Sequence, residues 1–305
     1  MHSEPNKRPG LGTLLVLTAA LLWGTTGTAA TFAPEVSPLA IGAAALGIGG
    51  LLQAVIAGAS LPVALPQLRR QWPTVIAGGI GVFAYPLAFY SSMHQAGVTI
   101  GTVVSLGSAP LFAVLLEWAV GRTRPGKHWA AAAILGLTGM LILSLSGGEV
   151  GGQPGGTLPG VALGLLAGAS YAGYAWATHR LISPAVSSRA AMGAVFGVGG
   201  ALLLPVLVVT GAPFLSSWRV LGVGVYMALV PMFLGYLLFG YALRHLNAGT
   251  ATLLTLSEPV IAALFAAIIV GERLTGPGLV GMGVIVLSLL VNATPPKPHR
   301  RPPVE

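Results

Sequence analysis

Ten long apolar stretches dominate this sequence of 305 residues. Each has about the 20 residues that a helix needs to cross the hydrocarbon core of a membrane. The runs are continuously apolar, whereas the strands of a membrane barrel alternate and are about 10 residues long, so helices are predicted. The stretches are 11–33, 38–59, 74–93, 99–120, 129–146, 158–179, 190–211, 218–243, 249–270 and 277–293. The expected fold is an all-α integral membrane protein with ten transmembrane helices.

The composition excludes several classes of protein. Charged residues make up 7% of the chain, whereas a soluble domain carries about a quarter. A soluble enzyme, a disordered chain and a nucleic-acid binder are therefore excluded, and the absence of Cys excludes disulfides and Cys-ligated metals. Segment 121–128 resembles a phosphate-binding loop, but His128 replaces its final Ser or Thr. We expect no cofactor, metal, nucleotide or nucleic acid, and the lipid bilayer as a partner.

The basic residues predict the orientation in the membrane. If the N-terminus is cytoplasmic, all but two of the 15 Lys and Arg residues fall on the inside, the exceptions being Arg219 and Arg273. The opposite orientation violates the positive-inside rule. The sequence therefore predicts that both termini are cytoplasmic, with tails at 1–10 and 294–305.

The two halves of the chain are similar in sequence. A shift of 149 residues places Pro110 on Pro259 and aligns SAPLFAVL (108–115) with SEPVIAAL (257–264). A shift of 148 residues places Trp23 on Tyr171. Because each half holds an odd number of spans, the second half enters the membrane from the opposite side. We therefore expect two inverted five-helix repeats, at 11–146 and 158–293, joined by a linker at 147–157.

A central cavity is expected between these repeats, lined by the first, third, fourth, sixth, eighth and ninth spans. Pro110 and Pro259 each remove a helical hydrogen bond at midspan, and paired breaks in corresponding repeats indicate a central site. Ser108, beside Pro110, adds a hydroxyl group to this region. Two ordinary kinked helices are the alternative.

Two acidic residues fall within the apolar stretches. Glu117 lies near the cytoplasmic end of its span, beside Arg122 and Arg124, and is expected to be an interfacial carboxylate. Glu258 is the tenth residue of its span, near the bilayer midplane, where a charge is costly. Two roles remain open for Glu258: a group that couples protons or binds a substrate ammonium, or a protonated carboxyl that stabilises helix packing.

Aromatic residues gather at midspan in several helices. Buried Trp and Tyr side chains need partners for their polar atoms, so several of these residues are expected to face a cavity rather than lipid. Plain packing is the alternative role for each. The predicted aromatic wall consists of Trp23, Tyr85, Tyr90, Tyr171, Tyr174 and Trp176.

These motifs resemble a known family. ALLWG (20–24) and SEPVIAALFAAIIVGERLTGPGLVGMGVIVL (257–287) are similar to segments of the drug/metabolite transporter superfamily, in its ten-helix EamA-type branch. The first repeat departs from the pattern at Arg122, where the second has Glu272. Within the branch, the chain resembles the YddG-type aromatic amino-acid exporters.

The resemblance implies a carrier and not an enzyme. It implies export of aromatic and other neutral amino acids by alternating access across a bacterial inner membrane. We expect the aromatic wall and Ser108 to contact such a substrate. A carrier of other small metabolites or drugs from the same superfamily would share these features and remains the alternative. An intramembrane enzyme is the rival from another class, although a chain without Asp or Cys offers it few catalytic groups.

Overall fold

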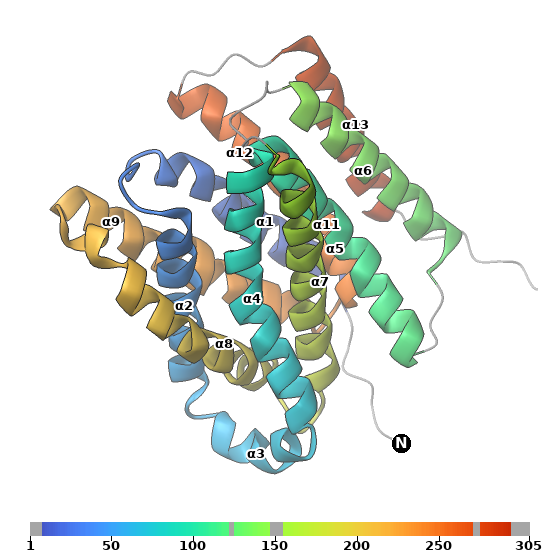
Figure 1. The fold of residues 1–305 in the computed structure, drawn as a ribbon. Helices are drawn as coiled ribbons and strands as arrows, with labels where there is room; N and C mark the ends of the chain where they lie inside the picture. The colour runs from blue at the N-terminus through green and yellow to red at the C-terminus, as the bar shows by residue number, and fades with distance from the viewer. Residues whose placement is uncertain (1–7, 122–124, 147–154, 271–274, 294–305) are drawn as a thin grey trace, which may run out of the picture.

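A computed structural model of the chain describes residues 8–121, 125–146, 155–270 and 275–293 (Figure 1). Within these ranges the secondary structure is helical, apart from one isolated bridge between Ser183 and Val186. The helices are α1 (Pro9–Ala30), α2 (Pro38–Ala57), α3 (Leu61–Arg70), α4 (Trp72–Ala96), α5 (Val98–Gly121), α6 (Lys127–Ser146), α7 (Thr157–Leu181), α8 (Ser188–Thr210), η1 (Ala212–Leu215), α9 (Trp218–Met227), η2 (Ala228–Gly235), α10 (Tyr236–Ala242), α11 (Ala248–Leu254), α12 (Ser257–Phe265), η3 (Ala266–Val270) and α13 (Gly276–Ala293). The expectation of an all-α fold is confirmed.

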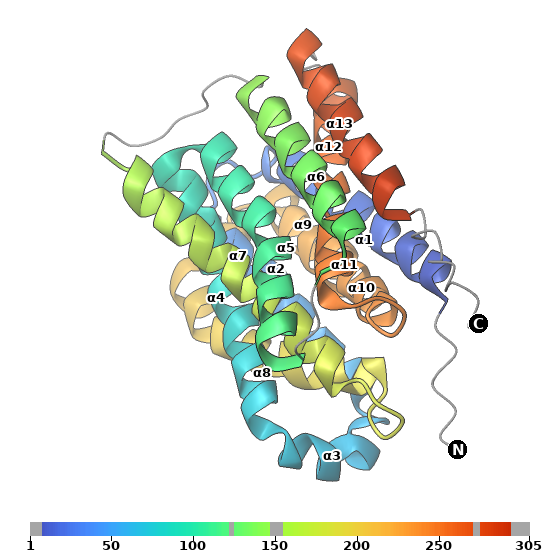
Figure 2. The same ribbon diagram turned by 90° about the vertical axis from the view of Figure 1, so that its right-hand side faces the viewer.

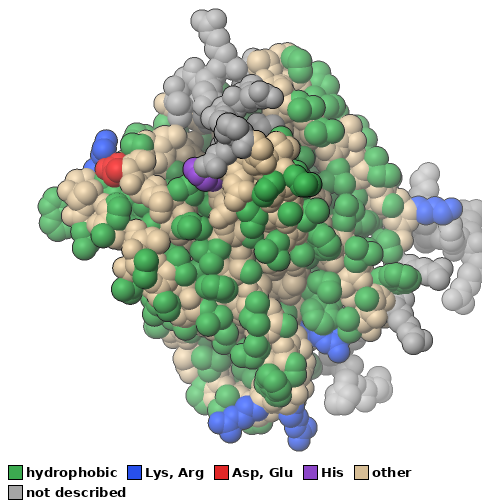
Figure 3. Space-filling model, viewed as in Figure 1, with side chains coloured by type: hydrophobic (Ala, Val, Ile, Leu, Met, Phe, Trp, Pro, Cys, Tyr) green, Lys and Arg blue, Asp and Glu red, His purple; other side chains and the backbone are tan. Residues whose placement is uncertain are grey.

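Nine helical runs in the described part of the chain are long and apolar enough to cross a membrane. The tenth expected span corresponds to α13, whose apolar run Gly276–Asn292 is shorter. Large apolar side chains point outward, with Ile134 67%, Val208 81% and Ile268 78% exposed. In Figure 3 hydrophobic side chains cover most of the visible face, and Lys and Arg lie at its edges. This surface is the one that lipid tails solvate and water does not.

Short polar residues begin several of the helices. The side chains of Ser37, Ser187, Ser217 and Asn247 accept hydrogen bonds from the backbone N–H three residues later, at 2.8–3.3 Å. These bonds cap α2, α8, α9 and α11 and satisfy donors that the helix itself leaves free. The local sequence therefore fixes where these helices start.

Segment 60–73, which falls between two of the expected spans, is largely helical. Helix α3 covers Leu61–Arg70 and buries Ala64 and Leu68, four residues apart on one face. Arg69 and Arg70 occupy its last turn, where positive charge favours the C-terminal end of the helix. Pro62 lies in the first turn, where a proline costs no hydrogen bond, and the helix continues through Pro66.

Two of the expected spans are interrupted in the structure. Span 218–243 is made of α9, a π-helical segment η2 around Pro231, and α10. Span 249–270 is made of α11, a turn at Thr255 and Leu256, α12 and the π-helical segment η3. Both interruptions lie in the second half of the chain.

Helices from the two halves of the chain pack against each other in pairs. Helix α2 packs along α8, α4 and α5 pack along α7, and α1 packs along η2, α10 and α12. Helices α6 and α13 lie side by side in both ribbon views, at the right-hand edge of the molecule in Figure 1 and facing the viewer in Figure 2. Ser288 Oγ donates to the Ala132 carbonyl at 2.6 Å between them. The peripheral pair leaves the other spans to surround the centre of the molecule.

Small residues allow the closest of these contacts. A Cβ added at Gly50 would lie 2.5 Å from the Phe196 carbonyl and 3.3 Å from Gly200 Cα. A Cβ at Gly200 would in turn lie 2.8 Å from the Gly47 carbonyl and 3.2 Å from Gly50 C. The α2 and α8 backbones therefore meet directly, as small residues permit in membrane helices.

Several expectations concern residues beyond the described ranges. Tail 294–305, most of tail 1–10 and most of linker 147–157 lie outside them, as do Arg122, Arg124 and Arg273. These expectations stay predictions.

Candidate functional site

A small cavity lies at the centre of the molecule, where six of the spans converge. It is lined by Trp23, Thr26, Gly42, Ala45, Leu46, Tyr85, Pro86, Phe89, Tyr90, Tyr171, Met232, Tyr236 and Glu258. About 30 Å³ is open to water-sized molecules in this state, enough for about two waters at roughly 10–15 Å³ each. Ligand pockets usually measure about 300–1,000 Å³, so the cavity in this structure is much smaller than a typical ligand pocket.

Trp23 lies in α1 at the wall of the cavity and is 4% exposed. Its Nε1 donates to the Pro231 carbonyl at 2.9 Å, in the π-helical segment η2. Its ring centroid lies 4.7 Å from that of Tyr236 and 5.5 Å from that of Phe239. A Cβ added at Gly235 would lie 2.7 Å from the Trp23 Nε1, so the missing side chain leaves space for the indole.

Three tyrosines of the predicted wall also line the cavity. Tyr85 and Tyr90 come from α4 and Tyr171 comes from α7. The ring centroids of Tyr85 and Tyr171 are 5.4 Å apart, a tilted contact. The hydroxyl of Tyr171 donates to Thr255 Oγ1 at 3.2 Å, at the turn between α11 and α12. The aromatic wall is therefore joined to the interrupted span.

Among the described residues that line the cavity, Glu258 is the acidic one, and none is a Lys, Arg or His. It lies in the first turn of α12, one residue before Pro259, and is half-buried. Pro259 cannot donate to the Thr255 carbonyl, and the backbone N–H of Glu258 donates to that carbonyl instead, at 2.9 Å. The break expected near Pro259 thus places Glu258 at the start of a half-helix that faces the cavity.

The break expected at Pro110 is absent. Helix α5 continues through Pro110 from Val98 to Gly121. Ser108 Oγ donates to the Ser105 carbonyl at 3.4 Å, and the space that a Gly168 Cβ would occupy on α7 is filled by Ser108 Oγ. The hydroxyl near Pro110 therefore serves the backbone and the α5–α7 contact, and Ser108 lies outside the cavity lining.

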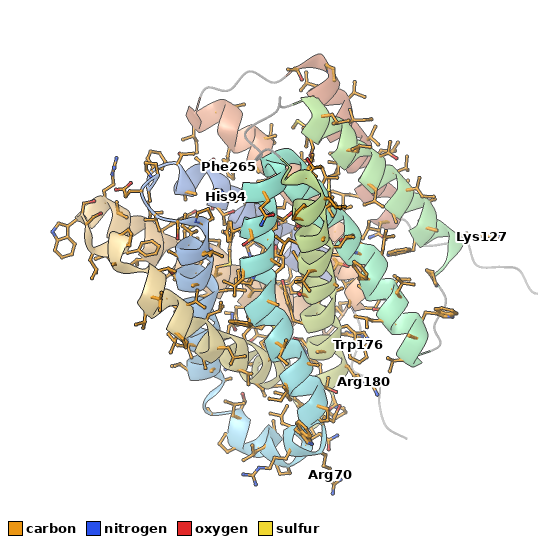
Figure 4. The ribbon with its side chains drawn as sticks, viewed as in Figure 1. Arg70, His94, Lys127, Trp176, Arg180 and Phe265 are labelled. Atoms are coloured by element: carbon orange, nitrogen blue, oxygen red, sulfur yellow. The ribbon has the colours of Figure 1, made fainter. Side chains whose placement is uncertain are left out.

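Tyr174 and Trp176, two further residues of the predicted wall, are not in the lining. Tyr174 is 0% exposed, and its hydroxyl lies 2.8 Å from the hydroxyl of Tyr236. The Trp176 ring contacts the guanidinium of Arg180, whose Cζ is 5.4 Å from the ring centroid. Figure 4 shows the side chains of Trp176 and Arg180 near one end of α7. Tyr174 supports the wall from behind, and Trp176 pairs with a charge at a helix end.

The cavity also differs from the expectation in which spans supply it. Gly42, Ala45 and Leu46 of α2 line it, whereas none of the described residues of α5 does. A Cβ at Gly42 would lie 2.8 Å from Tyr90 Cδ2, so the glycine gives the Tyr90 ring its place. A single span does not reveal which neighbour it packs against, and the sequence therefore misplaced this wall.

Five further lining side chains lie on the spans that were expected but were not selected. The repeat offset carried one available signal, because a shift of 150 residues places Pro86, within the aromatic cluster of α4, on Tyr236. Phe89 belongs to the same aromatic cluster as Tyr85 and Tyr90. No signal in the sequence marked Thr26 and Met232. The five residues are Thr26, Pro86, Phe89, Met232 and Tyr236.

Glu117 lies at the end of α5, away from the cavity lining. Its Oε1 accepts a hydrogen bond from the Gly249 backbone N–H at 3.1 Å, in the first turn of α11. A carboxylate is favourable at the start of a helix, where backbone N–H groups are free.

Within the described residues, no three His, Asp or Glu side chains lie close enough together to hold a metal ion.

Comparison with known proteins identifies the family. The model of the EamA-like transporter family matches residues 10–145 and 158–294. The chain is 35% identical over 292 residues to the uncharacterized transporter YwfM of Bacillus subtilis, covering 94% of this chain and 95% of that protein. A solved structure with 22% sequence identity superimposes with a TM-score of 0.74, covering 92% of this chain and 96% of the other.

Two further relatives carry names that state a substrate. The aromatic amino acid exporter YddG of Ancylobacter novellus is 32% identical over 172 residues, which cover 56% of this chain and 57% of that protein. The threonine/homoserine exporter RhtA of Escherichia coli K12 is 27% identical over 276 residues, covering 90% of this chain and 88% of that protein.

Proposed function

Because the chain belongs to the EamA-like transporter family, we propose that it exports aromatic and other neutral amino acids across the bacterial inner membrane. The family resemblance found in the sequence is thereby confirmed, and the relatives are transporters and exporters. The export direction and the substrate class are supported by the names of two relatives, an aromatic amino acid exporter and a threonine/homoserine exporter.

The observation that carries the substrate proposal is the central cavity. Its walls present aromatic rings from α1, α4, α7 and α10, with one carboxyl group from α12. Aromatic contacts contribute about 0.5–1.5 kcal/mol per pair beyond burial, and a carboxylate pairs with an ammonium group. The walls therefore offer an amino acid an apolar surface for its side chain and a partner for its amino group.

Alternating access is proposed to arise from two inverted repeats, residues 11–146 and 158–293. The helix pairs support this: α2 contacts α8 and α6 contacts α13, which are equivalent spans of the two halves. The pair α4–α7 has its counterpart in α10–α1, and α5–α7 has its counterpart in α12–α1. Gly50 and Gly200, equivalent at a shift of 150 residues, contact each other, as residues on a two-fold axis do.

Both termini are proposed to be cytoplasmic. Pro9 at the start of α1 and Asn292 near the end of α13 border one cleft, together with His179 at the end of α7 and His245 in the α10–α11 loop. These four positions all fall on the side that the basic residues assign to the cytoplasm. The arrangement agrees with an even number of membrane crossings between the termini.

Transport by the purified chain in proteoliposomes tests the proposal. Radiolabelled phenylalanine and threonine are expected to enter protein-containing vesicles in a saturable way, above vesicles that lack the protein. A panel of sugars, nucleosides and drug-like cations is measured in parallel. Saturable flux of a panel compound, with none of any amino acid, would contradict the proposed substrate and favour another metabolite or drug carrier.

A further inference from the structure

The central cavity is lined by an acidic side chain without a basic counterpart. Glu258 contributes a carboxyl group, and the described residues of the lining include no Lys, Arg or His. Among the described residues, no side chain forms a hydrogen bond or ion pair with this carboxyl group. Acidic groups within a membrane are costly and usually have a partner or face a water-filled space. A positive group that enters the cavity from outside the chain would supply such a partner.

The aromatic walls reinforce this preference for positive charge. Trp23 and Tyr236 lie at a ring centroid distance of 4.7 Å on one side, and Tyr85 and Tyr171 at 5.4 Å on another. The faces of such rings are electronegative and attract organic ammonium groups, as aromatic cages do. The same faces repel anions. The carboxyl group and the ring faces thus favour the same charge.

A substrate carboxylate finds no positively charged partner among the described residues of the lining, which offers it only hydroxyl groups. Carboxylates are usually held by Arg or Lys, or by the free N–H groups at the start of a half-helix. The first option is absent from the lining. At the second, α12 begins at Ser257, and Glu258 lies in its first turn, where its negative charge opposes an incoming carboxylate. The N–H of Glu258 is also already bonded to the Thr255 carbonyl.

We propose that the cavity recognises the ammonium group of its substrate and does not require a carboxylate, so that primary arylalkylamines bind it as well as amino acids do. The inference rests on the proposed function in taking this cavity as the transport site. It differs from that function in the class of ligand, because an amine without a carboxyl group is a monocation and an amino acid is a zwitterion.

Binding of three compounds that share a phenyl ring tests the inference. Phenethylamine carries the amine alone, phenylalanine carries both groups, and 3-phenylpropionate carries the carboxylate alone. Each is titrated by calorimetry into the purified full chain in detergent. Phenethylamine is expected to bind at least as tightly as phenylalanine and about 10-fold or more tightly than 3-phenylpropionate.

Two carboxyl variants assign the preference to Glu258. Glu258→Gln is expected to reduce the ratio of amine to carboxylate affinity by about 10-fold. Glu117→Gln is the matched control, because Glu117 also lies in a membrane helix but bonds to Gly249 outside the lining. This control is expected to leave the ratio unchanged. Should Glu258→Gln fail to fold, the ranking of the three compounds on the unmodified chain decides the question.

The outcomes separate this inference from the proposed function. Binding of 3-phenylpropionate as tight as that of phenethylamine, or no binding of any of the three compounds, overturns the inference. Phenethylamine binding by a chain that carries no amino acid in proteoliposomes supports the inference and overturns amino-acid transport. Amino-acid transport together with a preference for 3-phenylpropionate overturns the inference alone.

Discussion

Trp23 combines a structural contact with a place in the cavity wall. Its indole N–H satisfies a carbonyl of the π-helical segment η2, while its ring lines the cavity. Both roles follow from its position at the middle of α1, where a buried Trp needs a partner for its N–H group. A single substitution therefore changes packing and substrate contact together, and a second one is needed to separate them.

Trp23→Ala is expected to lower the ratio of phenylalanine flux to threonine flux by about 2- to 10-fold, because ring contacts of about 0.5–1.5 kcal/mol are lost for the aromatic substrate only. Flux is measured in proteoliposomes at matched amounts of folded protein. Trp23→Phe keeps an aromatic ring and removes the N–H group. It is expected to lower thermal stability and to change the flux ratio less than Trp23→Ala does. Trp176→Ala is the control, since Trp176 is not in the lining. An unchanged ratio in Trp23→Ala removes Trp23 from the substrate site.

Tyr174→Phe is expected to lower stability by about 0.5–1.5 kcal/mol and to leave the flux ratio unchanged, because it removes one hydrogen bond behind the wall. The hydroxyl pair with Tyr236, at 2.8 Å, is fully buried on the Tyr174 side. Thermal unfolding in detergent and the two fluxes are the measurements. Tyr171→Phe, at a residue of the cavity lining, is the comparison. If Tyr174→Phe changed the phenylalanine-to-threonine flux ratio more than Tyr171→Phe does, Tyr174 would belong to the site.

Which aromatic side chains reach the cavity depends on the rotation of each helix. Tyr171 and Tyr174 are both buried and stack on each other at a centroid distance of 5.1 Å, yet only Tyr171 lines the cavity. The sequence identified Trp23, Tyr85, Tyr90, Tyr171 and Glu258, because polar and aromatic groups at midspan need a partner or water. The sequence could not distinguish Tyr174 from Tyr171, because both are tyrosines within the same apolar span.

At the scale of the elements, the lengths and number of the spans followed from the apolar runs, and their interruptions did not. Prolines lie inside α4, α5 and α8, and these helices continue through Pro86, Pro110 and Pro205. At Pro231 the helix widens, and the Pro231 and Phe233 carbonyls accept from Trp23 Nε1 and Gln53 Nε2. The interruption at Pro231 thus coincides with side chains of α1 and α2 that bond to its carbonyls, and such partners are invisible in a single sequence.

Gly168→Ala in α7 tests the close contact between α5 and α7. A Cβ there would lie 2.7 Å from the Ser105 carbonyl and would overlap Ser108 Oγ. Overpacking of this kind costs about 1–3 kcal/mol, so the melting temperature in detergent is expected to fall. Gly173→Ala, also in α7, has no atom within 4 Å of its added Cβ and is expected to leave stability equal or slightly higher. Equal stabilities for the two variants would contradict the packing.

At the scale of the whole molecule, the orientation rests on charge asymmetry and the fold alone does not determine it. A chain without Cys makes the test direct. Single cysteines replace Ala59, between α2 and α3, and Ser216, between α8 and α9, both exposed. In intact cells, an impermeant thiol reagent added outside is expected to label Ser216→Cys and to spare Ala59→Cys. Broken cells, where both label, provide the control, and the reverse pattern in intact cells would invert the topology.

The small volume of the central cavity has a consequence for the proton gradient across the membrane. A bacterial membrane stores a proton gradient, and a continuous file of water through a protein would dissipate it. A file across about 30 Å of hydrocarbon needs roughly ten waters at hydrogen-bonding distance. With about 30 Å³ open to water, the cavity holds about two. In this state the transporter therefore keeps an acidic group in the interior of the membrane without giving protons a conducting path through that cavity.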